Sequence, residues 1–221
     1  MCLLRKKIHH LFTCWHTKKA NAQCVNCGSL ERHRIIWTYL KRETNFFTSS
    51  LKVLNVAPEK IFCTKLRALP NIEYTSIDLY PDKYDYGSKT IQMDLTAMTF
   101  EDNKFDVIIC NHVLEHVPND TQAMREMCRV LKPGGWAIIN VPVDPDRTTT
   151  FEDVTINDPK KQLELFGQPD HVRVYGKDYV ERLTNAGFTV DVFDYTNKFT
   201  HNEMFRYGMV KDREIYLCSK K

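Results

Sequence analysis

The 221-residue sequence lacks the features that mark several classes of protein. No apolar run approaches the roughly 18 residues of a membrane-spanning helix. The first residues, MCLLRKKIHHLFTCW, have no small-residue cleavage site and make a poor secretory signal. No internal repeat or low-complexity segment occurs. Because 43% of the residues are apolar and 27% are charged, the chain is typical of a globular protein, which we expect in the cytoplasm.

A disulfide framework is also missing, although the chain holds eight cysteines. Cys110 ends an apolar run and Cys128 lies in a helical pattern, where a cysteine behaves as a small hydrophobic residue. Only Cys24 and Cys27 have a spacing suited to chemistry. In a reducing compartment such a C-x-x-C pair favours a metal over a bridge.

The stretch Cys24-Val-Asn-Cys27-Gly28-Ser29 has the form of a zinc knuckle, in which the glycine permits a tight turn. Structural zinc needs four ligands, so the pair needs partners. The nearby cysteines and histidines form no complete set; they are Cys2, His9, His10, Cys14, His16 and His33. Two interpretations stay open: zinc held by an irregular set, or a knuckle that serves only packing. The incomplete set argues against stable zinc.

Positive charge is concentrated at the N-terminus. Residues 1–45 hold nine lysines and arginines against two acidic residues, a net charge of +7, on a chain whose total is +3. A basic end can serve an anionic partner such as RNA or a membrane surface, or it can be a solvated tail. Arg32, His33 and Arg34 stand near the start of a predicted helix, where positive charge opposes the helix dipole. They therefore either bind an anionic substrate group or pair with acids of the main domain.

Strands and helices alternate along most of the chain. A first helix is predicted from Ser29 to just before Thr48. Strands are predicted at 51–57, 71–80, 91–96, 104–113, 136–143, 188–195 and 213–220, and further helices at 58–69, 119–131 and 177–187. This alternation predicts an α/β fold, with a mainly parallel sheet, helices on both faces and an antiparallel C-terminal edge. The connection between the last two strands shows no clear helix.

The loop after the first predicted strand has no glycine, although nucleotide-binding turns of α/β enzymes usually hold two or three. It lies in V-L-N-V-A-P-E, residues 53–59. Ligands of such sheets bind beyond the carboxyl ends of the central strands, and polar residues gather there. Asp78 ends the second strand and suits a ribose, because a carboxylate can accept both vicinal hydroxyl protons. Asp94 ends the third and is placed to accept from an amine such as that of adenine, while Asn111 and His112 follow the fourth.

Five stretches carry a resemblance to a known family. In order, over roughly residues 51–143, they are V-L-N-V-A-P-E, Y-T-S-I-D-L-Y, I-Q-M-D-L-T, F-D-V-I-I-C-N-H-V-L-E-H-V and M-C-R-V-L-K-P-G-G-W-A-I-I-N-V-P. Together they resemble the class I S-adenosylmethionine-dependent methyltransferases, in their UbiE-like, type 11 branch. The resemblance implies a Rossmann-like seven-stranded sheet in residues 49–221, with an insertion or lid around 144–176. Residues 1–48 would then be an N-terminal appendage that holds the basic segment, the knuckle and a helix.

The resemblance implies S-adenosylmethionine as the cofactor and a small-molecule substrate that is methylated on oxygen or nitrogen. The cofactor-binding residues that it implies are Asn55, Ala57, Pro58, Glu59, Asp78, Leu79, Asp94, Leu95, Asn111, His112 and His116. The family usually has an acid at position 55 and glycines at 57 and 59, so the loop departs from the pattern. Glu59 could hold the cationic amino group of the cofactor, or it could be a first-turn acid favoured by the helix dipole.

Methyl transfer to a hydroxyl requires in-line placement of the nucleophile and a base to take its proton. His112 is one candidate, and a polar segment at 166–176 holds others. It lies in an insertion of about thirty residues, long enough to be a functional lid. His171, Arg173 and Tyr175 alternate as on one strand face and would point together into a pocket. We predict His171 as the base and Arg173 as the group that reads an anionic or carbonyl group; the alternative is a surface hairpin.

Other interpretations of these segments remain. His112-x-x-Glu115-His116 matches an H-x-x-E-H zinc motif, but the segment is short and its L-E-H-V string also occurs in relatives without metal. A cysteine knuckle and a basic N-terminal region also precede the domain of an rRNA methyltransferase family, so RNA is a second candidate substrate. Against RNA, the chain has no aromatic-rich basic patch. A non-catalytic binding protein on the same fold is the third candidate. The sequence predicts no oligomeric state.

Overall fold

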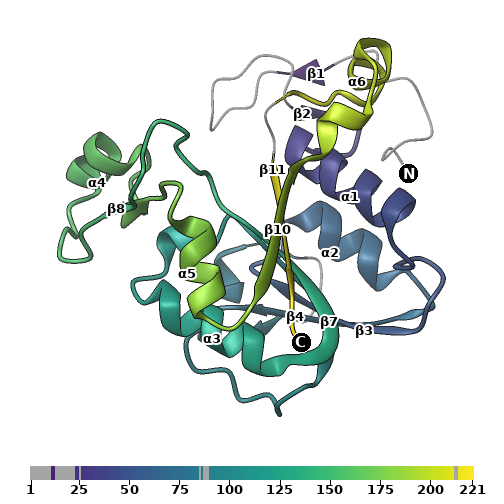
Figure 1. The fold of residues 1–221 in the computed structure, drawn as a ribbon, viewed down its shortest axis with the longest axis horizontal. Coiled ribbons are helices and arrows are strands. Elements are labelled where there is room, and N and C mark those ends of the chain that lie inside the picture. The colour runs from purple at the N-terminus through teal and green to yellow at the C-terminus, as the bar shows by residue number, and fades with distance from the viewer. Residues whose placement is uncertain (1–10, 13–22, 25, 85, 87–89, 212–213) are drawn as a thin grey trace.

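The centre of the molecule is a seven-stranded sheet (Figure 1). This computed structural model describes residues 11–12, 23–24, 26–84, 86, 90–211 and 214–221. In their order across the sheet the strands are β10 (Thr189–Asp194), β11 (Glu214–Ser219), β7 (Leu131–Asn140), β6 (Phe105–Asn111), β3 (Leu51–Val56), β4 (Ile72–Asp78) and β5 (Ile91–Gln92).

Strand directions confirm the predicted mainly parallel sheet. Strands β7, β6, β3, β4 and β5 run parallel, whereas β11 runs antiparallel to both β7 and β10. The last two strands thus form an antiparallel pair at one side of the sheet, with β10 outermost. All five parallel strands end at the same edge of the sheet, where a ligand site is expected.

Helices cover both faces of the sheet (Figure 1). Helices α1 (Glu31–Glu43) and α2 (Lys60–Arg67) lie on one face, and α3 (Asp120–Val130) and α5 (Tyr179–Asn185) on the other. Successive strand residues point to opposite faces. Val53 accordingly packs in the cluster that contains α1 and α2, and Leu54 in the one that contains α3 and α5.

Helix α1 belongs to the main core although it lies within the predicted appendage. Ile35, Ile36 and Leu40 are buried in one cluster with Val107 and Ile109 of β6. The appendage therefore contributes a helix that covers the sheet. In the part of the chain that the structure describes, no helix combines the length and apolar character needed to cross a membrane.

Smaller elements complete the fold. They are β1 (Leu11–Phe12), β2 (Gln23–Cys24), β8 (Phe151–Glu152), β9 (Arg173–Val174), α4 (Pro159–Phe166), α6 (His201–Tyr207) and the 3-10 turns η1 (Pro81–Lys83), η2 (Leu114–His116) and η3 (Tyr195–Lys198). Strands β1 and β2 pair antiparallel, as do β8 and β9. The predicted insertion around 144–176 is thus an ordered unit of two short strands and a helix.

Two local expectations were wrong. The connection between β10 and β11 contains α6, where no clear helix is predicted. A capping box begins this helix, since Thr200 Oγ1 accepts from the Glu203 backbone while the Glu203 carboxylate accepts from the Thr200 backbone. Strand β7 begins at Leu131 rather than at residue 136, because Lys132 to Gly135 form an irregular bulge opposite Phe105–Val107 and not a break.

Candidate active site

The turn from β3 into α2 keeps the shape of a glycine turn without a glycine. Ala57 has φ 42°, in the left-handed region that disfavours any residue with a Cβ atom. Its N–H donates to the Ile77 carbonyl at 2.8 Å, which ties the turn to β4. The strained alanine therefore holds the backbone in the conformation that such a loop requires.

Glu59 precedes α2 at the N-cap position, yet its side chain makes no capping hydrogen bond. Its Oε1 instead accepts from Arg32 Nε at 3.2 Å, from His33 Nε2 at 2.8 Å and from Asn111 Nδ2 at 2.9 Å. The carboxylate thus joins α1 to the end of β6. Its side chain therefore does not cap α2 through a hydrogen bond, and both roles considered for Glu59, in cofactor binding and at the helix dipole, stay predictions.

The hydrogen bonds of His33 define which ring nitrogen carries a proton. The Leu30 N–H donates to His33 Nδ1 at 3.1 Å, so Nε2–H must be the group that faces Glu59. Burial alone would raise the pKa of Glu59, but His33, Arg32 and His112 lower it from 4.5 to about 2. Glu59 is therefore ionised at neutral pH. Arg32 and His33 thus pair with an acid of the main domain. This is one of the two roles that the sequence analysis considers for these residues, the other being to bind an anionic substrate group.

Asn111 presents an acceptor with no partner. Its side chain is buried at the end of β6, where Nδ2 donates to Glu59. Its Oδ1 is also buried and has no hydrogen-bond partner among the described residues. A buried polar atom left without a partner costs about 1–3 kcal/mol. An ionised carboxylate beside an amide oxygen that has no hydrogen-bond donor among the described residues suits a ligand with a cationic amino group or another strong hydrogen-bond donor.

Asp78 lies at the end of β4, as the sequence predicts, and is buried. Its Oδ1 accepts from the Tyr80 N–H and its Oδ2 from the Tyr86 hydroxyl, both at 2.6 Å. Burial and the nearby carboxylate raise the pKa of Tyr86. Asp78 therefore already accepts from one hydroxyl group at the place where a ribose is expected, and a bound ribose would have to compete with Tyr86.

Asp94 and its neighbours lie beyond the end of β5. Asp94 is exposed, and its Oδ1 accepts from both the N–H and the hydroxyl of Thr96 at 2.8 Å. Leu95 is buried beneath it, whereas Leu79 beside Asp78 is exposed. Asp78 and Asp94 thus stand at the ends of adjacent strands, β4 and β5, and their contacts with a cofactor stay predictions.

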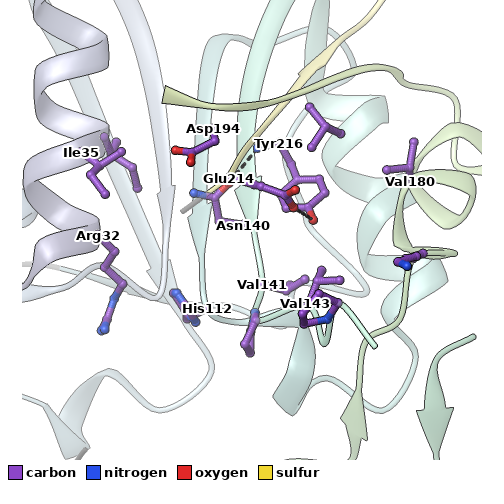
Figure 2. Close-up of a pocket in the computed structure, with 15 residues that line it drawn as sticks. Arg32, Ile35, His112, Asn140, Val141, Val143, Val180, Asp194, Glu214 and Tyr216 are labelled. Atoms are coloured by element: carbon purple, nitrogen blue, oxygen red, sulfur yellow. Dashed lines mark hydrogen bonds between the residues drawn. The ribbon is translucent and has the colours of Figure 1, made fainter. Parts of the chain in front are cut away.

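A cavity of about 690 Å³ opens at the carboxyl ends of β6 and β7 (Figure 2). This volume suits a small or medium-sized ligand. Figure 2 shows Arg32 and Ile35 projecting from α1 on one side and Val180 of α5 on the other. The full lining is Arg32, Ile35, Ile36, His112, Asn140, Val141, Pro142, Val143, Pro145, Lys177, Val180, Val192, Asp194, Glu214 and Tyr216. The sequence analysis missed Asn140, whose Oδ1 accepts from the Tyr216 N–H at 3.0 Å.

His112 lies between this cavity and the Glu59–Asn111 pair. Its backbone is left-handed, with φ 57°, and its N–H donates to the Asn140 carbonyl at 2.8 Å. Its Nδ1 lies 3.2 Å from Oε1 of the buried Glu115. Burial would raise the pKa of Glu115, but His112 and His116 hold it below its usual range. An ionised Glu115 accepts from Nδ1–H, which leaves a lone pair on Nε2 of His112, as a base requires.

The other three predicted catalytic residues do not line the cavity. Arg173 is fully buried and donates to the carbonyls of Leu114, Val117 and Pro118 and to Glu152. Tyr175 is also buried, and its hydroxyl donates to Asp120 Oδ2 at 2.7 Å. The expectation that they face a substrate was wrong, because this face of the hairpin packs on the η2 turn.

His171, predicted as the base, packs elsewhere. Its ring stands edge-on to that of His116, with the centroids 4.6 Å apart. Burial and the neighbouring His116 lower the pKa of His171. Its Nε2 is buried without a hydrogen-bond partner among the described residues. Of the four predicted catalytic residues, only His112 is among the residues that line the cavity.

Asp120 has an interior role that the sequence analysis did not predict. Asn119 is the cap, and its Oδ1 accepts from the Gln122 N–H at 3.1 Å. Asp120 is buried and pairs with Arg182 at 2.9 Å. No local pattern distinguishes two adjacent polar residues of this kind, so only the fold shows which one is interior.

The cysteine pair forms a tight turn. Gly28 has φ 68° and donates its N–H to the Cys24 carbonyl at 2.8 Å. In the described ranges the pair is not part of any group of three or more metal-ligating side chains. The upstream cysteines and histidines, at positions 2 to 16, lie outside those ranges, so zinc at Cys24 and Cys27 stays a prediction.

Comparisons with known proteins found methyltransferases both among sequence relatives and among solved structures. A family model described as a methyltransferase domain matches residues 59–139, which contain Glu59, Asp78, Asp94, Asn111 and His112. The demethylmenaquinone methyltransferase of Staphylococcus aureus strain JH9 is 35% identical over 146 residues, which cover 61% of this chain and 59% of that protein. The same identity and coverage hold for strain Newman. The chain thus spans less than two thirds of the length of these relatives.

Solved structures share the fold at low sequence identity. A SAM-dependent methyltransferase from Archaeoglobus fulgidus has a TM-score of 0.57 at 16% identity, over 88% of this chain and 95% of that one. The cyclase SpnF has a TM-score of 0.61 at 18% identity, over 87% of this chain and 83% of that one. In its matched domain, its relatives and its fold, the chain is similar to the class I S-adenosylmethionine-dependent methyltransferases.

Proposed function

We propose that the protein uses S-adenosylmethionine to methylate an oxygen or nitrogen atom of a small or medium-sized molecule. The observation that carries this proposal is the unpartnered Asn111 Oδ1 beside the ionised Glu59, next to a cavity of about 690 Å³. The pair offers acceptors for a cationic ligand on one side of His112, and the cavity offers room for a second molecule on the other.

The residues at the strand ends fit the cofactor. Glu59 and Asn111 would accept from its amino group, Asp78 would hold its ribose hydroxyls, and Asp94 with Leu95 would border its adenine. When bound, S-adenosylmethionine supplies a methyl group made electrophilic by its sulfonium. The left-handed turn at Ala57 lets the backbone pass close to such a ligand.

The cavity fits a mainly apolar acceptor with a hydroxyl or amine group. Most of its lining is apolar, and its two cations, Arg32 and Lys177, are balanced by two acids, Asp194 and Glu214. Such a balance lacks the positive potential that RNA requires, so no observation favours a nucleic-acid substrate. The name of the Staphylococcus relatives supports a small organic acceptor. His112 would take the acceptor's proton on Nε2, and Glu115 would stabilise the resulting imidazolium.

Titration calorimetry with S-adenosylmethionine and S-adenosylhomocysteine tests the cofactor site. We expect a Kd below about 100 μM, in the range of metabolite sites. Asp78→Ala should weaken binding at least tenfold, whereas Glu73→Ala, at the other end of β4 and exposed, should not. Absence of binding by the wild-type chain at about 1 mM would refute the proposal.

Transfer of a labelled methyl group to a panel of phenols, quinols and amines tests catalysis. At saturating cofactor, His112→Gln should lower kcat by about 10²–10⁴-fold, the usual contribution of a general base. A wild-type chain that binds cofactor but methylates nothing in a broad panel would favour the non-catalytic binding protein.

A further inference from the structure

We propose that Glu115, His116 and His171 form a binding site for one divalent transition-metal ion. This site is separate from the cysteine pair and does not depend on the proposed methyl transfer. The three residues lie in two segments, the η2 turn and the chain just before β9. One ligand atom of each lies within 4.8 Å of the others.

Two polar atoms of these side chains have no hydrogen-bond partner among the residues that the structure describes. Glu115 Oε2 and His171 Nε2 are both buried, and neither has a hydrogen-bond partner in the described part of the chain. Native proteins rarely leave buried polar atoms unsatisfied, and a bound ion is one of the ways in which such atoms are satisfied. Two such atoms within one group of metal-ligating side chains, one anionic and one an imidazole nitrogen, point to a shared cation.

The remaining contacts of the two histidines orient them as ligands. His116 Nδ1 lies 3.2 Å from the Asp170 carbonyl and 3.3 Å from the Asp170 carboxylate, so Nδ1–H donates there and Nε2 keeps its lone pair. The His171 ring stands edge-on to that of His116, and its buried Nε2 has no hydrogen-bond partner among the described residues. Metal-bound histidines usually donate their other N–H to a carboxylate or backbone carbonyl, as His116 does here.

The surrounding hydrogen bonds hold the two segments in fixed register. The Val172 N–H donates to the Glu115 carbonyl at 3.0 Å. Arg173 donates to the carbonyls of Leu114 and Val117 on either side of the ligand pair. This gives the buried Arg173 a function, since its guanidinium locks the hairpin that carries His171 onto the turn that carries Glu115 and His116. A site on such a frame is preorganised.

The ligand set selects the class of metal. Two imidazoles and one carboxylate suit zinc and its first-row neighbours rather than magnesium or calcium. Zinc bonds of about 2.0–2.1 Å place tetrahedral ligand atoms about 3.4 Å apart, so the side chains must close by roughly 1 Å on binding. Three protein ligands leave at least one position for water or a substrate atom.

The set differs from the H-x-x-E-H motif in the sequence. His112 is not a member, because its Nδ1 is bonded to the other oxygen of Glu115. His171 takes its place from a distant part of the chain. Glu115 would thus bond the metal through Oε2 and His112 through Oε1, which links the ion to the residue that lines the cavity.

Metal binding by the full-length chain tests this site directly. A Cys24→Ser, Cys27→Ser background removes the knuckle as a competing ligand. After treatment with EDTA, this protein is dialysed against ZnCl₂ or CoCl₂ and its metal content is measured. We expect one equivalent of bound metal, and a cobalt spectrum without thiolate charge-transfer bands. No bound metal at about 100 μM of either ion, a concentration far above the affinity of protein zinc sites, overturns the proposal.

Variants locate the bound ion. In the same background, His171→Asn and His116→Asn should each weaken binding at least tenfold, a loss expected for residues that hold the metal. His201→Asn, an exposed histidine in α6, should bind like the background and serves as the matched control. Metal should also raise the Tm of the background and of His201→Asn, but not of the ligand variants. Metal retained at wild-type affinity by His171→Asn and His116→Asn would refute the assignment, and circular dichroism shows that each variant is folded.

Discussion

Replacing Glu59 by glutamine tests whether this side chain ties the N-terminal helix to the sheet. The carboxylate Oε1 has three donors, Arg32 and His33 from α1 and Asn111 from β6. Glutamine has nearly the same shape and keeps one acceptor oxygen, so Glu59→Gln removes the charge and little else. We expect a less stable protein with an unchanged fold.

The magnitude follows from the pKa of Glu59. Its fall from 4.5 to about 2 corresponds to about 3 kcal/mol, since each pKa unit is worth about 1.4 kcal/mol. The side chain is 23% exposed, and the variant keeps part of its hydrogen bonding, so about half of this is expected. Glu59→Gln should therefore lower the free energy of unfolding by roughly 1.5 kcal/mol at pH 7.

The pH dependence of the stability difference between wild type and Glu59→Gln distinguishes the loss of the charge from a packing defect. The folded-state pKa is depressed, so the stabilisation is fully present above pH 4.5 and is lost as the pH falls through about 2. Urea unfolding at pH 7, 5, 4 and 3 measures the difference between wild type and Glu59→Gln, which should narrow below pH 4.5. The exposed Glu73→Gln is the control. A difference that stays constant with pH, or no difference at pH 7, would refute the reasoning.

Three further changes test other parts of the structure. Ala57→Gly removes a Cβ atom at φ 42° and should raise stability by about 0.5–1 kcal/mol in thermal unfolding; a lower Tm would contradict the strained turn. Tyr86→Phe frees one oxygen of Asp78 and should tighten cofactor binding several-fold in calorimetry, while an unchanged Kd would show that ribose and Tyr86 do not compete. Arg173→Met leaves Glu152 and three backbone carbonyls without their donor and should cost about 3–5 kcal/mol in urea unfolding. An effect of Arg173→Met below about 1 kcal/mol would contradict its interior role.

Most of the fold could be predicted because local sequence patterns determine its helices and strands. Short apolar runs such as Val53–Val56 alternate with helical spacing, and the polar residues Asp78 and Asn111 mark where strands end. The N-cap of α6 could also be predicted, since Thr200 and Glu203 have capping-box spacing. It was overlooked because the helix has few apolar residues.

The interior roles of charged residues could not be predicted in the same way. Alternation correctly places Arg173 and Tyr175 on one face of a strand, but it does not say whether that face meets a cavity or another segment. Here it meets the η2 turn, and polar side chains that would otherwise bind a ligand bind backbone carbonyls and Asp120 instead. The proximity of His171 to Glu115 could not be predicted for the same reason, since it depends on how a hairpin distant in sequence packs on the η2 turn.

The N-terminal helix is therefore part of the site and not a separate appendage. Arg32 both donates to Glu59 and lines the cavity, so one side chain of α1 contacts both parts of the proposed site. This explains why basic residues begin a helix whose dipole they oppose: the local cost is offset by a carboxylate that only the folded sheet supplies. SpnF shows that this fold also supports a cyclase, so the fold alone does not determine the chemistry. Two carboxylates, the partly exposed Glu59 and the buried Glu115, each use one oxygen to hold neighbouring side chains in place. In both proposals made above, the other oxygen is the one that would bind a ligand.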